Sequence, residues 1–127
     1  MDTRVEEAVN KKKNGYNCAQ AVLCTYCDLA GIDEECAKQM TQAFAGGMCT
    51  MEASCGAMTG AAIALGLINK QPGKTMMDIR DMMTAFKEQN KSVICKELKG
   101  IETGQVLRAC DDCVRDAAML LEAHLQQ

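Results

Sequence analysis

The segment from Ala45 to Leu67, AGGMCTMEASCGAMTGAAIALGL, constrains the fold more than any other part of the chain. A Gly46-Gly47 pair opens it and predicts a break in secondary structure, followed by a loop over residues 48–53. The spacing then predicts a helix of small and apolar residues over 55–68, with Ser54 as its N-cap. A helix with such short side chains allows another element to approach its backbone closely.

The predicted helix contains three glycines, which indicate that another group lies close to its backbone. Each glycine costs a helix interior about 1 kcal/mol relative to alanine. Three such costs in one buried helix indicate that either a neighbouring helix or a ligand lies against it. The three glycines are Gly56, Gly60 and Gly66.

The overall composition favours helices as well. Hydrophobic residues make up 48% of the 127 residues, but aromatic residues only 3%, with one proline and no tryptophan. No useful run of alternating β-branched residues predicts a strand. We therefore expect an all-α protein, a single domain over residues 1–127 that folds as a compact bundle of about six to seven short helices.

Capping residues and glycines place the other predicted helices. We expect helices over 3–13, 18–31, 34–44, 75–90 and 93–100, and a last helix within 104–127. The predicted N-caps are Asn17, Asp33, Thr75, Ser92 and either Asp111 or Asp112.

The charge balance excludes several classes of partner. The net charge is −3 and the pI is about 5.1, which gives no basic surface for nucleic acid or an anionic membrane. The N-terminus has no apolar region typical of a signal peptide. The longest apolar run, Gly60–Ile68, is far shorter than the roughly 20 residues of a membrane span. We expect a cytoplasmic protein that binds neither nucleic acid nor membrane.

Nine cysteines are the most unusual feature of the composition. An odd number without a secretion signal argues against a disulfide framework and favours metal binding, redox chemistry or both. Several cysteines fall at predicted helix starts, where the helix dipole and free N–H groups lower a thiol pKa and stabilise the thiolate. Converging helix starts would hold thiolates or an anionic cluster, although buried cysteines also serve as small core residues. These cysteines are Cys18, Cys55, Cys95, Cys110 and Cys113.

Other cysteine patterns predict less. Cys24 and Cys27, like Cys110 and Cys113, are separated by two residues, which is typical of four-cysteine zinc sites. The long interval between the pairs, and the mid-helix position predicted for the first, argue against such a site. Cys36 is expected in the core. A methionine group over 76–83 is spaced for a helix core rather than a copper site.

The same residues carry a resemblance to a known family. The chain has YNCAQAV at 16–22, GGM at 46–48, CGAMTG at 55–60, and Cys95 within ICKELKG. Cys110 follows as the last cysteine of the pattern, with Cys113 as its close rival. Together these motifs, over roughly residues 5 to 125, resemble the redox-active proteins named for their C_GCAxxG_C_C motif.

The resemblance implies a small helical cytoplasmic protein with redox activity, and a related domain is associated with a [2Fe–2S] centre. It implies that Cys18, Cys55, Cys95 and Cys110 act as redox sulfurs or cluster ligands, beside Gly56 and Gly60. Cys49 and Cys113 are the alternates, because this chain has five cysteines beyond the family pattern.

Three functions remain open from the sequence. The first is electron transfer through a cysteine-ligated iron–sulfur centre, and the second is thiol–disulfide exchange. The third is a metal-binding or helical interaction module without catalysis, in which the glycine-rich helix forms a contact, for example in a homodimer. The first two require a redox partner protein, which the sequence does not identify.

Overall fold

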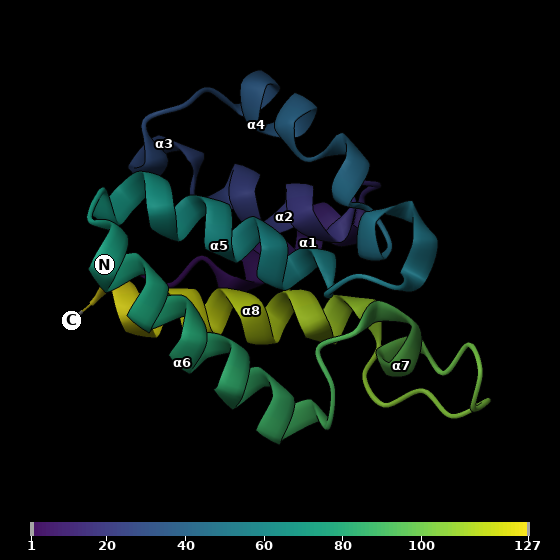
Figure 1. Ribbon diagram of the computed structural model, residues 1–127. Helices are drawn as coiled ribbons and strands as arrows, with labels where there is room; N and C mark the ends of the chain where they lie inside the picture. Colours follow the sequence, from purple (N-terminus) through teal and green to yellow (C-terminus); the bar gives the residue numbers. More distant parts are fainter. Residues whose placement is uncertain (1, 127) are drawn as a thin grey trace.

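Residues 2–126 are described by a computed structural model, and helices account for most of them (Figure 1). The α-helices are α1 (Val5–Lys13), α2 (Cys18–Thr25), α3 (Cys27–Ala30), α4 (Glu34–Met40), α5 (Gly56–Asn69), α6 (Pro72–Asn90), α7 (Cys95–Lys99) and α8 (Cys110–Leu125). Two short helical segments, η1 (Gln42–Phe44) and η2 (Gly47–Met51), lie between α4 and α5. The described residues contain no β-strand, so the all-α prediction is confirmed. Six helices have seven residues or more, within the six to seven expected.

Helix α5 lies in the middle of the fold. It packs against α2 on one side and against α6 and α8 on the other, while α1 packs against α2 and α8. In Figure 1, α5 and α8 run side by side and α6 crosses below them. Small side chains fill the space between α2, α5 and α8, with Tyr26 and Phe86 as the largest fully buried residues.

The contact between α2 and α5 depends on glycine. A Cβ atom added to Gly60 would lie 2.5 Å from the carbonyl oxygen of Ala19 and 3.0 Å from its Cα atom. Gly66 has no such neighbour, since its added Cβ would first meet the Cγ2 atom of Thr75 at 3.9 Å. At Gly60, therefore, a neighbouring helix makes the close approach that the sequence predicted.

Two of the predicted caps are confirmed. The Asn17 side chain accepts a hydrogen bond from the Gln20 amide at 2.8 Å, and the Gln20 side chain accepts from the Asn17 amide at 3.0 Å. This reciprocal capping box fixes the start of α2. Asp33 caps α4 through a hydrogen bond from the amide of Cys36 at 2.7 Å.

Two other predicted caps, Ser54 and Thr75, are wrong. Helix α5 begins one residue late, with Cys55 in the N-cap position, because the Cys55 amide donates to the carbonyl of Val93 instead. Helix α6 begins earlier, at Pro72, because proline suits the first position of a helix, where its missing N–H needs no partner.

The caps predicted for the last two helices are also wrong. Ser92 accepts from the amide of Ile94 and so stabilises the approach to α7 instead of capping it. Helix α8 already begins at Cys110, which places Asp111 and Asp112 inside its first turn, where carboxylates complement the helix dipole.

The helix predicted over 18–31 is interrupted at Tyr26. The Tyr26 side chain is fully buried, and its hydroxyl donates a hydrogen bond to the carboxylate of Glu122 in α8. This distant anchor ends α2, so that Cys27 starts the short helix α3. The mid-helix position predicted for Cys24 and Cys27 is therefore wrong.

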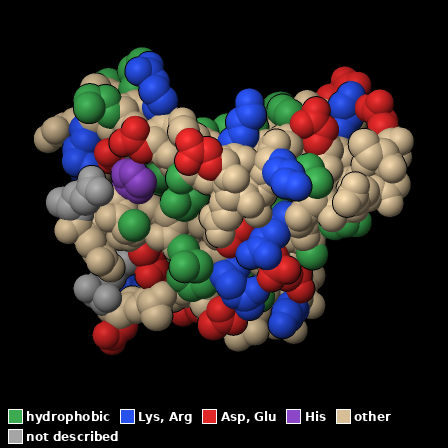
Figure 2. Space-filling view, turned by 90° about the horizontal axis from the view of Figure 1, so that it is seen from below, with side chains coloured by type: hydrophobic (Ala, Val, Ile, Leu, Met, Phe, Trp, Pro, Cys, Tyr) green, Lys and Arg blue, Asp and Glu red, His purple; other side chains and the backbone are tan. Residues whose placement is uncertain are grey.

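The surface also departs from one expectation. Of the methionines predicted to fill the core, Met82 is fully buried and Met83 packs against the core. Met76 and Met77 are instead 62% and 66% exposed, because they lie on the outer face of α6. The face shown in Figure 2 mixes acidic and basic side chains and has no extended basic area. Among residues 2–126, no helix combines the length and apolar character needed to cross a membrane.

Candidate functional site

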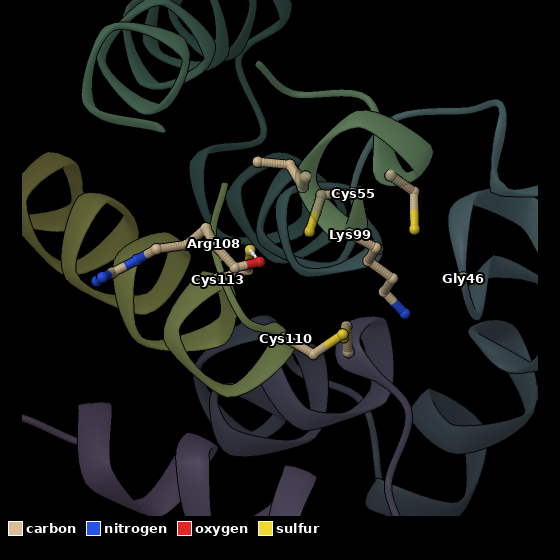
Figure 3. Close-up of a pocket in the computed structure, with 10 residues that line it drawn as sticks. Gly46, Cys55, Lys99, Arg108, Cys110 and Cys113 are labelled. Atoms are coloured by element: carbon tan, nitrogen blue, oxygen red, sulfur yellow. Dashed lines mark hydrogen bonds between the residues drawn. The ribbon is translucent and has the colours of Figure 1, made fainter. Parts of the chain in front are cut away.

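A single small pocket brings five cysteines together at the starts of four helices (Figure 3). Its cavity volume is about 10 Å³, which is close to the space of one water molecule. All four cysteines predicted as site residues line this pocket, as does the alternate Cys113. The lining residues are Cys18, Gly46, Cys55, Gly56, Cys95, Leu98, Lys99, Arg108, Cys110 and Cys113.

Cys18 is placed by the capping box at the start of α2. It is the first residue of that helix, directly after Asn17. The Asn17 side chain also donates a hydrogen bond to the carbonyl of Thr41 at 3.1 Å, which ties the helix start to the end of α4. The position of Cys18 is thus fixed by the hydrogen bonds of Asn17, both within α2 and to the end of α4.

Cys55 and Cys95 are joined by a short antiparallel pairing of their backbones. The amide of Cys55 donates to the carbonyl of Val93 at 2.7 Å, and the amide of Cys95 donates to the carbonyl of Ala53 at 3.0 Å. These two bonds place the starts of α5 and α7 next to each other.

Two glycines allow these helix starts to approach. A Cβ atom on Gly47 would lie 2.7 Å from the Cβ atom of Cys95, and one on Gly56 would lie 2.7 Å from the carbonyl oxygen of Phe44. Gly47 also has φ +60°, in the left-handed region that glycine adopts most easily. Side chains at either position would push the walls of the pocket apart.

Cys110 and Cys113 are held by the segment that leads into α8. The sulfur of Cys113 lies 3.8 Å from the carbonyl oxygen of Arg108. The guanidinium of Arg108 forms two hydrogen bonds of 3.0 Å with the buried carboxylate of Asp116, which also accepts from Asn90. The Arg108 side chain therefore points away from the pocket, as Figure 3 shows.

Cys18 and Cys110 form one pair of interacting thiols. The hydrogen bond with Cys110, followed by burial, raises the pKa of Cys18. The hydrogen bond from Cys18 lowers the pKa of Cys110 to about 5, with a further contribution from Lys99, while burial opposes the shift. The interaction therefore shifts the two pKa values in opposite directions, downward for Cys110 and upward for Cys18.

Cys55 and Cys113 form a second pair with the same asymmetry. The hydrogen bond from Cys113, helped by the amides of Ala57 and Met58, lowers the pKa of Cys55 against the effect of burial. The bond to Cys55 and burial raise the pKa of Cys113.

The fifth thiol, Cys95, lies 3.8 Å from the sulfur of Met51, and burial raises its pKa. The pKa is lowered at Cys55, where the amides at the start of α5 contribute as predicted, and at Cys110, where Cys18 and Lys99 lower it and not the helix start. The prediction of a lowered pKa fails for Cys18, Cys95 and Cys113, where a donated hydrogen bond or burial outweighs the helix dipole.

Several predicted site residues lie elsewhere. The side chain of Cys49 is exposed, and its thiol contacts the carbonyl of Ala43 at 3.8 Å. Gly60 packs against α2 instead of lining the pocket. Cys24, Cys27 and Cys36 are also outside the pocket, and Cys36 is exposed, so its predicted core position is wrong. It is solvated because it follows the Asp33 cap on the outer side of α4.

Sequence reasoning missed Lys99. It is the last residue of α7 and lies four residues after Cys95, so the two share a helix face. That four-residue spacing in the sequence would have indicated that Lys99 lies near the Cys95 thiol. In contrast, nothing in the sequence indicated the backbone pairing between residues 53–55 and 93–95, because neither segment has the pattern of a strand.

The helical fold and the buried group of thiols define a small all-α protein with a cysteine-lined pocket. Residues 16–124 match the family model described as "Putative redox-active protein (C_GCAxxG_C_C)", and the chain belongs to this family. Neither a search of curated proteins nor one of solved structures found a match. The description of the family supports a redox role for its members.

Proposed function

We propose that the sulfur pocket is an electron-transfer centre that holds an iron–sulfur group through four thiolates. The observation that carries the proposal is the presence of five cysteines, brought from four separate helix starts into one pocket. Electron transfer by such a centre needs no further catalytic side chain. The nine thiols, all free in the structure, support a reducing compartment such as the cytoplasm.

The donor set fits a [2Fe–2S] group, in which four cysteines bind, two to each iron. The pairs Cys18–Cys110 and Cys55–Cys113 match this division. Within residues 2–126 no group of three or more His, Cys, Asp or Glu side chains is arranged to hold a metal ion. If Cys95 binds in place of Cys113, the four ligands are those that the family pattern implies. The small cavity requires the thiols to move apart on binding.

The group itself supplies one-electron chemistry when bound. The protein contributes burial, which excludes water, and the amides at the start of α5, which donate toward the Cys55 sulfur. Hydrogen bonds to sulfur and burial are the main means by which a protein adjusts the potential of such a centre.

The test is anaerobic purification followed by a visible spectrum and measurement of iron and acid-labile sulfide. We expect charge-transfer absorption with iron and sulfide in equal amounts. Cys55→Ser should lose both while keeping its helicity, and Cys36→Ser, on the outside of α4, is the matched control that should keep both. A colourless wild-type protein after reconstitution with iron and sulfide would reject the iron–sulfur proposal.

Thiol–disulfide exchange is the second candidate, and the small cavity and uneven sharing of protons favour it. The Cys110 thiolate attacks one sulfur of a partner disulfide, and the other partner sulfur leaves as a thiolate that takes up a proton. Cys18 then loses its proton and attacks the Cys110 sulfur, which releases the second partner thiol. The protein is oxidised by two electrons to a Cys18–Cys110 disulfide, and the partner disulfide is reduced to two thiols.

A colourless protein would support exchange if mass spectrometry found a Cys18–Cys110 disulfide after treatment with a small-molecule disulfide. Cys18→Ser should then stop at the mixed disulfide on Cys110. A colourless protein with unreactive pocket thiols would contradict both mechanisms. It would leave a metal-binding or helical interaction module as the function.

A further inference from the structure

Lys99 places a positive charge beside the pocket thiols. It is the last residue of α7. Its side chain lines the pocket, as does Cys95 on the same face of that helix. Figure 3 shows the side chain extending from α7 toward Cys110. Lys99 and Cys110 line the same pocket, so the ammonium group is directed to the side of the pocket where Cys110 lies.

Lys99 has no competing carboxylate in the part of the chain that the structure describes. None of the ion pairs within residues 2–126 includes it, and none of the ten lining residues is acidic. The other basic lining residue, Arg108, is held by Asp116 outside the pocket. Lys96, on the same helix, instead pairs with Glu102 at 2.9 Å. Lys99 is therefore the basic residue whose charge is directed to the sulfurs.

The position of Lys99 is fixed by the backbone around it. The side chain of its neighbour Leu98 is buried, and the carbonyl of Leu98 accepts from the amides of Leu107 and Arg108 at 2.9 and 3.2 Å. The bond between Cys95 and Ala53 anchors the other end of α7. Backbone hydrogen bonds therefore hold both ends of this short helix, and they fix the position of the Lys99 backbone beside the pocket.

We propose that Lys99 is a positioning residue that compensates the negative charge of the reduced sulfur centre and thereby raises its reduction potential. The inference rests on the redox function proposed above, but it applies to both mechanisms. Reduction of a Cys18–Cys110 disulfide by two electrons and one proton leaves one thiol and one thiolate in the pocket, and one-electron reduction of an iron–sulfur group also adds negative charge. A nearby cation stabilises either reduced state.

The surroundings of Cys110 support this assignment. Lys99 is partly exposed, so its ammonium group keeps the charge that lysine carries in water. The other charged or titratable groups that act on Cys110 are Cys18 on α2, Cys55 before α5, Cys95 on α7, Cys113 on α8, and Lys12 on α1. Lys12 contributes less to Cys110 than Lys99 does.

The experiment compares midpoint potentials of the full-length wild type with Lys99→Met, Lys99→Gln, Lys99→Arg and Lys96→Met. Potentials are measured in glutathione or dithiothreitol redox buffers by thiol labelling and mass spectrometry, or by visible absorption if the protein is coloured. Lys96→Met removes the same charge from the same helix but outside the pocket, so it is the matched control. Thermal unfolding followed by circular dichroism checks that each variant is folded.

We expect both neutral variants to lower the equilibrium constant for reduction at least tenfold. That change equals about 30 mV for a two-electron couple and about 59 mV for a one-electron couple. Lys99→Arg should restore most of the difference, and Lys96→Met should match the wild type. If the neutral Lys99 variants have the same potential as Lys96→Met, the proposed role of Lys99 is wrong, while the redox function itself is not contradicted. A wild type without any reversible couple would instead overturn the proposed function, and with it this inference.

Discussion

Replacement of Gly60 by alanine tests whether the contact between α2 and α5 holds the site together. The added Cβ would lie 2.5 Å from the carbonyl oxygen of Ala19, closer than folded proteins tolerate. The oxygen belongs to the backbone of α2, so no side-chain rotation relieves the overlap. Gly66 in the same helix provides the matched control, because its Cβ would make an ordinary contact of 3.9 Å with Thr75.

The two substitutions should have opposite effects on stability. Alanine in place of glycine stabilises a helix interior by roughly 0.5–1 kcal/mol, and Gly66→Ala should gain this amount. In Gly60→Ala, overpacking that typically costs about 1–3 kcal/mol exceeds this gain, and a backbone clash lies at the upper end of that range. We expect Gly60→Ala to lower the free energy of unfolding by about 2 kcal/mol, and therefore to differ from Gly66→Ala by about 3 kcal/mol.

The assay is urea unfolding followed by far-ultraviolet circular dichroism, with the denaturant slope compared among the three proteins. Equal or higher stability of Gly60→Ala relative to Gly66→Ala would refute the reasoning, because it would show that α2 does not lie against Gly60. The site supplies a second measurement. Displacement of α2 carries Cys18 with it, so Gly60→Ala should also increase the labelling of Cys18 by a thiol reagent.

Three further predictions concern the thiols and the helix cap. Alkylation of Cys110 should change little between about pH 8 and about pH 6 and slow toward about pH 5, because its lowered pKa keeps it a thiolate above that pH. Cys24, whose pKa burial raises to about 11, should hardly react, and faster labelling of Cys24 than of Cys110 would contradict these shifts. Cys55→Ser should abolish redox activity and Cys36→Ser should not, so equal losses would invalidate our division of the cysteines. Asn17→Ala should cost about 1 kcal/mol in urea unfolding, and no loss would show that the capping box is unimportant.

The parts of the site that follow from local chemistry were predictable from the sequence. Asn17 and Gln20 satisfy each other's backbone amides within four residues, so the start of α2 at Cys18 could be inferred without knowledge of the fold. The gathering of four cysteines was suggested by their common position near helix starts and by the family pattern. Their placement around one pocket agrees with that expectation, whereas their redox roles remain to be tested.

The parts that depend on distant contacts were not predictable. Helix α2 ends at Tyr26 because its hydroxyl finds Glu122, which lies 96 residues further along the chain. Cys55 becomes an N-cap because its amide finds Val93. Local propensity describes neither contact, and the same is true of the contact with Cys18 that lowers the pKa of Cys110.

Fold and site meet in the glycines of α5. Gly60 brings α2 against α5, and one turn earlier an added Cβ on Gly56 would lie 3.5 Å from the Cβ atom of Cys18. The contact that packs the two helices therefore also sets how near Cys18 comes to the start of α5, where Cys55 lies. Larger residues at these glycines would separate the thiols even if the helices still formed. The small residues of α5 therefore have two roles. They allow α2 to pack against α5 in the core, and they set the distances between the cysteines of the pocket.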